Sequence, residues 1–468
     1  MKRLILILII ALSAPSLFAA GMNLPNIGAR AMAMGGAYRA VAGDGTAIYW
    51  NPAGLSGQNS SAEILGQFLF TRSSYTAADT LRQLNSLFRE EERENLDPRF
   101  VLGNFYLVYS PDNSGRWSFG LGGYTPTGVG TRWNVMEDRT SDNVTTVNPR
   151  EMNPVYPDSD FAVGITEPLP DTDFRARIGT FTLSPSAAFR TSEKLSFGIA
   201  PTVTYAMLKG DIPSSDPERM EADTGIILQQ IDMTGWSGGA VFGGMYRPRE
   251  NLCFGLSARL ESRYYFRGDY EETVFKFYNE YLASLGAIFG DTVLTGGVLK
   301  KPVVDGRAEL QRPQELGFGA AYLPSPDWTL SADIAWVTWS AVDTIELLST
   351  DDERLEALPM HWEDTYRLSA GAEYRGKGYA LRLGLFYEPN PGIPDYQNLL
   401  IPEMNDRLAY TGGVSVRLGD YDLQFSGEYE YFGDLVTEAN WEDEYPTNIP
   451  GTYNSRVMDF VLSISRDF

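Results

Sequence analysis

Residues able to do acid–base or nucleophilic chemistry are few in this 468-residue chain. The single histidine, His361, precedes Glu363 and Asp364, a spacing that allows a histidine–carboxylate pair. No nucleophile motif such as Gly-x-Ser-x-Gly surrounds it, so the pair points to no hydrolytic site. The single cysteine, Cys253, excludes a disulfide framework and any metal site built from several thiolates. We therefore predict no enzyme activity and no cofactor, and we expect His361 to be a solvated loop residue.

The overall charge excludes another class of partner. The chain carries 61 acidic residues against 38 basic ones, a net charge of -23. Because neutralising phosphates requires a surplus of lysine and arginine, we predict no nucleic-acid partner. Aromatic residues make up 13% of the chain and glycines number 46, a mixture that suits strands, turns and the aromatic girdles of membrane barrels.

The first residues indicate export. Lys2 and Arg3 precede an apolar run over residues 4–12, and small residues follow at Ala19 and Ala20. This is the pattern of a secretory signal peptide, which we assign to residues 1–19. The run is too short to span a bilayer as a helix, which takes about 20 residues. Since we find no other apolar run of that length, a membrane-embedded mature chain would have to be a closed β-barrel.

The remaining chain alternates polar and apolar residues with period two. In the last segment, Phe460, Leu462 and Ile464 share one face, while Asp459 and Ser463 lie on the other. Similar segments recur upstream, and their second faces hold small or ionisable residues, among them Arg259, Glu261, Asp333, Arg367, Glu373 and Arg417. This alternation is typical of strands that separate two different environments.

We predict about fourteen strands. They fall near residues 61–72, 99–110, 115–125, 176–191, 193–209, 231–247, 251–267, 300–323, 327–340, 365–375, 377–388, 406–419, 420–434 and 454–468. Their connections alternate between short turns and long loops. A soluble β-sandwich has no reason to segregate its loops, whereas a transmembrane antiparallel β-barrel does so with its short turns in the periplasm. The fold class we expect is therefore all-β, with an outer-membrane barrel over residues 59–468.

Residues 20–58 precede the first strand and are rich in alanine and glycine. A barrel of about fourteen strands is wider than its own side chains can fill, since about eight strands already reach that limit. We predict that this segment is an N-terminal hatch that plugs the lumen. The alternative is a periplasmic tail that packs beneath the barrel.

Three blocks in register carry a resemblance to a known family. They are Gly35-Gly36-Ala37 with Asp44 and residues 49–55; Pro313 with residues 316–322, Trp328 and residues 336–340; and residues 362–367 with residues 370–374. Together they resemble the FadL family, the outer-membrane transporters of long-chain fatty acids and other hydrophobic compounds. The resemblance covers essentially the whole mature chain and implies a fourteen-stranded barrel with a hatch, in the outer membrane of a Gram-negative bacterium.

The resemblance also implies a route. Ligands would bind in the lumen and leave sideways where the third strand kinks beside the hatch, so the hatch and gate residues would be Asn51, Pro52, Ala53 and Gly54. The predicted third strand contains Gly120, Gly122 and Gly123, and glycine within a strand permits a bulge or bend. The alternative is that Gly122 and Gly123 only allow close packing against the hatch.

Two long loops have apolar positions at helical spacing and could capture ligand outside. These loops are residues 73–98 and 268–299, and the residues that we expect to contact ligand are Leu84, Phe88, Phe277, Tyr281, Leu285 and Phe289. The alternative is that they pack on one another and close the barrel top. Transport would be passive, because contact with apolar protein surface would replace contact with water step by step. The burial of each methylene contributes about 0.8 kcal/mol of favourable free energy.

The partners that we expect are a hydrophobic small molecule, outer-membrane lipid and lipopolysaccharide, and the barrel-assembly machinery, whose recognition signal the terminal Phe468 resembles. A carboxylate head group would need a basic partner, and Arg175, Arg177, Lys300 and Lys301 lie near outer strand ends. We assign none of them, because basic residues at a barrel rim more often contact lipid phosphates. In addition, the block formed by Glu363 and Asp364 is acidic where fatty-acid transporters of the family that the chain resembles would often carry a base. Neutral aromatic hydrocarbons therefore remain an alternative substrate, and a general diffusion porin remains an alternative function.

Overall fold

The computed structural model describes residues 24, 26–84, 88–96, 99–111, 116–136, 161–163, 173–213, 225–276, 297–401, 405–440 and 448–468. The predicted signal peptide and the loop residues Phe277, Tyr281, Leu285 and Phe289 lie outside them. All strands belong to one antiparallel sheet that closes on itself, because the first strand pairs with both its neighbour and the last strand.

The wall of the barrel has fourteen strand positions, as predicted. We call each position a stave, whether one strand or two consecutive strands occupy it. In order around the barrel they are β1 (Ser61–Ala77), β3 (Arg99–Tyr109), β4 (Trp117–Tyr124) with β5 (Gly128–Trp133), β7 (Phe174–Ser192), β8 (Leu195–Pro213), β9 (Gly225–Arg249), β10 (Leu252–Glu261) with β11 (Tyr264–Lys276), β14 (Glu315–Ser325) with β13 (Val304–Leu310), β15 (Trp328–Val337), β18 (Thr365–Arg375), β19 (Tyr379–Glu388), β20 (Arg407–Leu418), β21 (Tyr421–Thr437) and β22 (Gly451–Asp467). The end of the barrel that carries the long loops is called the outer end, and the end that carries the short turns is called the inner end. Short strands toward the outer end are β2 (Arg93–Glu94), β6 (Phe161–Val163), β12 (Gly297–Lys300), β16 (Thr344–Ser349) and β17 (Arg354–Pro359).

Two predicted strands are not continuous. The predicted strand at 300–323 is wrong as a single element, because it is divided among β12, β13 and β14, with breaks at Pro302 and Pro313. Proline has no N–H to donate to a ladder, which explains both breaks. The predicted strand at 251–267 is divided at residues 262–263. The strand predicted at 115–125 is present as β4, and the wall continues beyond it as β5, which was predicted to be loop.

Side-chain burial follows the predicted alternation. Along β15, Thr329, Ser331 and Asp333 point inward and are buried, whereas Leu330 and Ile334 point outward and are exposed. The outward faces carry large apolar side chains on nearly every stave, as a lipid-facing surface requires. The charged residues singled out from the sequence face inward and are buried at Arg259, Glu261, Asp333 and Glu373; Arg367 is half-buried and Arg417 is exposed.

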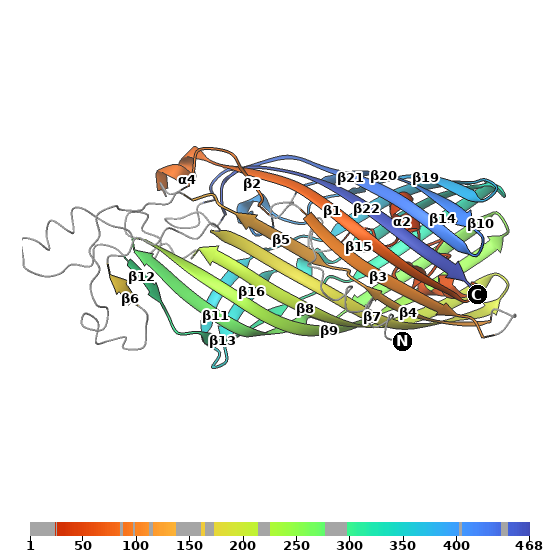
Figure 1. Ribbon diagram of the computed structural model, residues 1–468, viewed down its shortest axis with the longest axis horizontal. Coiled ribbons are helices and arrows are strands. Elements are labelled where there is room, and N and C mark those ends of the chain that lie inside the picture. Colours follow the sequence, from red (N-terminus) through yellow and green to blue (C-terminus); the bar gives the residue numbers. More distant parts are fainter. Residues whose placement is uncertain are drawn as a thin grey trace, which may run out of the picture.

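Short helices lie at both ends of the barrel (Figure 1). The N-terminal ones are α2 (Ala29–Ala33), α3 (Ala47–Trp50) and η1 (Pro52–Leu55), and the later ones are α4 (Asp79–Leu84), η2 (Trp339–Ala341) and η3 (Pro394–Tyr396). Within the part of the chain that the structure describes, no helix is both long and apolar enough to cross a membrane. In Figure 1, α2 lies inside the barrel near the end that holds the C-terminus, while α4 lies at the opposite, outer end.

Candidate transport pathway

The N-terminal segment fills the inner half of the lumen, which confirms its predicted packing inside the barrel. Ala31, Met32, Tyr38 and Ile48 are completely buried, in one apolar cluster with inward-facing residues of the wall. Small side chains let this segment approach the strands closely. At Gly384 of β19, for example, an added Cβ would lie 2.2 Å from the backbone nitrogen of Gly35.

A buried ion-pair cluster fastens the hatch to the wall at Arg39. Its Nη1 lies 3.3 Å from Oδ2 of Asp333, and its Nη2 lies 2.5 Å from Oε1 of Glu315. The backbone N–H groups of Tyr38 and Arg39 also donate to Asp333, at 3.0 and 2.9 Å. Burial alone would lower the pKa of the Arg39 guanidinium, but the charges of Glu315 and Asp333 outweigh burial and raise that pKa above its ordinary value.

A second cluster holds α2. Arg30 donates two hydrogen bonds to the carboxylate of Glu373, at 2.8 and 3.0 Å, in the bidentate geometry that favours arginine. Glu373 also accepts hydrogen bonds from Arg375 and Arg382, both at 2.6 Å. Three guanidinium groups therefore share one buried carboxylate, and the hatch supplies one of them.

The predicted gate residues pack against β8 and β9. Asn51 donates to the carbonyl oxygens of Arg39, at 2.8 Å, and Gly244, at 3.1 Å, and it accepts from the N–H of Ala53 at 3.2 Å. Wall glycines leave the room for this segment, since a Cβ at Gly198 would lie 2.3 Å from the carbonyl carbon of Pro52. A gating role for Asn51, Pro52, Ala53 and Gly54 stays a prediction.

The predicted kink glycines lie in β4, beside α3 of the hatch. A Cβ at Gly120 would lie 2.8 Å from Ile48 of the hatch, and one at Gly122 would lie 3.2 Å from it. A Cβ at Gly123 would instead meet the ring of Phe105 at 2.2 Å. These distances agree with close packing against the hatch at Gly120 and Gly122, and a kink at Gly120, Gly122 and Gly123 stays a prediction. The break in the strand lies a few residues farther on.

At that break the wall has a stretch without backbone pairing, which we call the inner window. The ladder between β3 and β4 ends at the pair Phe105 and Gly123, and β5 then forms a ladder with β7 alone among the described strands. The gap lies between residues 100–104 and 125–130. The side chain of Asn104 accepts a hydrogen bond from the N–H of Thr125 at 3.2 Å, across the inner margin.

A bulge produces the inner window. Tyr124 pairs with Thr182, and Gly128 pairs with Gly179, so β4–β5 contains one residue more than β7 between these pairs. The carbonyl oxygen of Pro126, in the bulge, accepts from the N–H of Leu24 at 3.1 Å. The hatch therefore touches the window through Leu24, a residue that the sequence analysis did not single out.

An apolar cluster lines the outer half of the lumen and ends at this window. Its members include Trp133, Trp339 and Trp362 near the outer end, and Leu24, Phe100 and Leu102 at the window. Trp339 and Trp362 meet edge to face, with ring centroids 5.2 Å apart. The cluster offers contacts suited to an apolar molecule along the whole distance from the outer loops to the inner window.

Two of the predicted capture residues, Leu84 and Phe88, lie within the described residues. Leu84 ends α4. Phe88 is buried in the apolar cluster, with its ring centroid 6.4 Å from that of Phe174. This burial matches the alternative in which apolar loop residues pack on one another, and capture by Leu84 and Phe88 stays a prediction.

The polar groups at the outer end hold loops in place. Nδ1 of His361 lies 2.6 Å from Oδ1 of Asp343, so its partner is neither Glu363 nor Asp364. Asp173 accepts from the backbone N–H groups of Val135 and Met136, at 2.7 and 2.6 Å, and burial raises the pKa of its carboxyl to about 6. Among the described residues, no three His, Cys, Asp or Glu side chains gather as a metal site would require.

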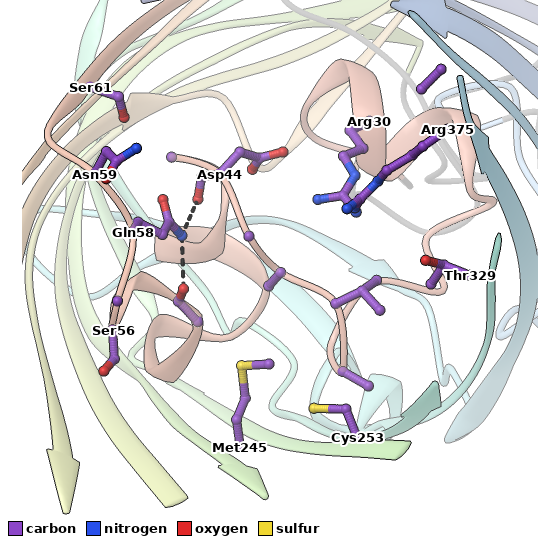
Figure 2. Close-up of a pocket in the computed structure, with 18 of the residues that line it drawn as sticks. Arg30, Asp44, Ser56, Gln58, Asn59, Ser61, Met245, Cys253, Thr329 and Arg375 are labelled. Carbon is purple, nitrogen blue, oxygen red and sulfur yellow. Dashed lines mark hydrogen bonds between the residues drawn. The ribbon is translucent and has the colours of Figure 1, made fainter. Parts of the chain in front are cut away.

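A cavity of about 900 Å³ lies below the hatch at the inner end of the barrel. Its lining is mostly polar, and Figure 2 shows Arg30 and Arg375 on one side with Asp44, Gln58 and Ser61 on the other. The amide of Gln58 donates to the carbonyl oxygens of Asp44 and Gly54, at 3.1 and 2.8 Å. We call this cavity the vestibule. Because its lining is mostly polar, it is a poor site for an apolar ligand, and the hatch separates it from the apolar cluster.

Comparison with known proteins places the chain in context. Residues 171–464 match the family described as outer membrane protein transport protein (OMPP1/FadL/TodX). The chain is 24% identical over 261 residues to a long-chain fatty acid transport protein of Escherichia coli, a match that covers 50% of this chain and 55% of that relative. The chain thus spans about half the length of that curated relative.

Two solved structures share the fold. A Pseudomonas aeruginosa FadL homologue superposes with a TM-score of 0.73 and 16% identity, over 96% of this chain and all of that one. The Pseudomonas putida toluene transporter TodX superposes with a TM-score of 0.66 and 17% identity, over 96% of this chain and all of that one.

Proposed function

This chain belongs to the OMPP1/FadL/TodX family of outer membrane transport proteins, and from that premise we propose that it takes up long-chain fatty acids and releases them sideways through the inner window. Passage of hydrophobic compounds through the outer membrane of a Gram-negative bacterium is the function of such a barrel, and no catalytic step is involved. The observation that carries the lateral release is the continuity of the apolar cluster with the inner window.

The energetics favour a sideways exit over an axial one. Below the inner window, the hatch and its buried ion pairs block the axis, and the vestibule beneath is polar. An apolar molecule that moved along the axis would exchange apolar contacts for charged ones and lose about 0.8 kcal/mol for each exposed methylene. Through the inner window it would pass from protein to lipid without meeting water.

One observation favours neutral aromatic hydrocarbons as a second candidate substrate. The buried arginines of the described residues already have carboxylate partners within 4 Å; they are Arg39, Arg259, Arg312, Arg382 and Arg407. Two of the rim residues noted above, Arg175 and Lys301, pair with Asp211 and Glu272. A fatty-acid carboxylate would have to compete with these acids, whereas a neutral ring would not. The structural likeness to a toluene transporter agrees with this candidate.

Uptake by cells that lack their own transporters of this kind tests the proposal. Cells that express the chain should accumulate radiolabelled oleate faster than cells with an empty vector. Faster uptake of radiolabelled toluene with unchanged oleate uptake would transfer the proposal to the second candidate. Ion conductance of the purified barrel in a planar bilayer tests the porin alternative, which requires large and steady currents.

Two further partners stay proposals. Phe468 is 73% exposed, and its N–H donates to the carbonyl oxygen of Ser60 at 2.8 Å, so the terminal residue is fixed and accessible. This suits recognition by the barrel-assembly machinery. The exposed apolar faces of the staves suit outer-membrane lipid and lipopolysaccharide.

A further inference from the structure

We propose that a second gap in the wall, between β13–β14 and β15–β16, is the entrance through which apolar substrate reaches the lumen. This inference rests on the proposed function and adds the place of capture. We call the gap the outer window; its edges are residues 309–313 and 339–346.

The strand ladders define the outer window. The ladder between β14 and β15 ends at the pair Glu315 and Val337, and the ladder between β13 and β16 comprises only residues 306–308 with 347–349. Gln314 and Thr338 close the inner margin, because the N–H of Thr338 donates to the carbonyl oxygen of Gln314 at 3.0 Å. Between these points, no ladder joins the two edges among the described residues.

On the side that faces β10, hydrogen bonds close the same break. There the side-chain amide of Gln314 takes the place of a backbone peptide: it accepts from the N–H of Glu261 at 2.8 Å and donates to the carbonyl oxygen of Glu261 at 2.7 Å. Arg312 points inward and lies 2.5 Å from a carboxylate oxygen of Glu261. The break caused by Pro313 therefore opens the wall toward β15 and β16 only.

A cavity of about 830 Å³ occupies this gap and is lined by both faces of the wall. Ala308, Leu310 and Val342 are buried and belong to the apolar cluster of the lumen. Arg263 and Glu309 line the same cavity and are exposed outside, where they form an ion pair at 2.6 Å. Because strand residues alternate between the two faces, the cavity touches both faces of the wall, from the exposed ion pair to members of the apolar cluster.

The outer window lies at the level where apolar solutes gather. Trp236, Tyr265 and Trp336 point outward and are more than half exposed, as expected of the outer aromatic girdle of a barrel. Tyr265 neighbours Tyr264, which pairs with Leu310 at the edge of the window. The exposed lining residues of the cavity include Arg263, Glu309, Asp343 and Glu346, whereas its buried lining residues, Ala308, Leu310, Val342 and Ala357, are apolar. A molecule from the outer leaflet would therefore pass a charged rim before it reached apolar side chains.

The two windows are well separated. The inner window follows the second stave and the outer window follows the eighth, so they lie on nearly opposite sides of a fourteen-stave barrel. Four residues lie between the inner window and the inner end of β3 at Tyr109, whereas eleven lie between the outer window and the inner end of β14 at Ser325. Substrate would enter near the outer interface, cross the apolar cluster, and leave nearer the inner leaflet.

The first test fills the gap. Ala341 lines the cavity and is half-buried, so Ala341→Trp should obstruct it. Ala332 points outward from β15 and is exposed, so Ala332→Trp is the matched control. We expect Ala341→Trp to lose most of the uptake of radiolabelled oleate and toluene, and Ala332→Trp to match the wild type.

A reversible block avoids any question of folding. In a Cys253→Ser background, Ala341→Cys is assayed before and after modification with a charged methanethiosulfonate reagent, with Ala332→Cys as control. Uptake should fall on modification of Ala341→Cys and return when a reducing agent removes the label. If the modified Ala341→Cys and Ala341→Trp variants both keep the control rate, the outer window is not the entrance. If the wild type itself takes up neither probe, the proposed function fails instead.

Discussion

Asp333 accepts three hydrogen bonds from the hatch: two from the backbone N–H groups of Tyr38 and Arg39, and one from the Arg39 guanidinium. Asp333 lies on β15, nearly three hundred residues after Arg39, and 5% of it is exposed. This single carboxylate therefore holds both the backbone and a side chain of the hatch against the wall.

Asp333→Ala should loosen the hatch. The substitution leaves a buried guanidinium with only Glu315 as its ionic partner, and breaking a buried pair in this way costs about 3–5 kcal/mol. We expect a lower unfolding temperature of the purified barrel and transient ion currents in planar bilayers. Asp327→Ala, in an exposed inner turn, is the control and should change neither. Unchanged currents in Asp333→Ala would show that the hatch is held mainly elsewhere.

Gly198→Ala should displace the Asn51–Gly54 segment. The added methyl would lie 2.3 Å from the backbone of Pro52, and a backbone cannot yield as a flexible side chain can. Gly238→Ala on the neighbouring strand is the matched control, because its nearest atom would be 3.8 Å away. Limited proteolysis should cleave the hatch faster in Gly198→Ala only. Equal cleavage in both variants would contradict the close approach.

Deletion of residues 21–54 should convert the barrel into a leaky pore. The deletion removes the apolar and ionic contacts that fill the inner lumen, and a fourteen-stave barrel cannot fill itself. Single-channel recordings should show a large increase in steady conductance over the intact protein. If the conductance is unchanged, these residues are not the plug.

Deletion of Pro126 should narrow the inner window. It removes the one extra residue between the Tyr124 and Gly128 pairs, so β4 and β5 can join in a continuous ladder with β7. Oleate uptake should fall, while Pro126→Ala, which keeps the residue count and therefore the bulge, should transport nearly as well as the wild type. Faster or equal uptake by the deletion variant would rule out exit through this window.

The strands and the hatch could be predicted from local patterns in the sequence. Alternation such as that of residues 459–468 needs only two environments on either side of a strand, so strand number and facing followed from it. The alternation of short turns with long loops indicated the outer-membrane barrel. The composition of residues 20–58 likewise predicted a segment able to pack inside a crowded lumen. Charged positions on the inward faces, such as Asp333 and Glu373, were also recognisable, although their partners Arg39 and Arg30 were not.

Only the tertiary structure decided where the wall opens and which charges neutralise one another. Both windows depend on the register between strands, and a single extra residue near Pro126 or a missing donor at Pro313 takes effect only against the neighbouring strand. Pairing of Arg39 with Asp333 depends on how a plug inserts into a closed cylinder. Alternation is a property of one strand and can be read along the chain, whereas a gap or a buried ion pair is a relationship between two segments, which for Arg39 and Asp333 lie nearly three hundred residues apart.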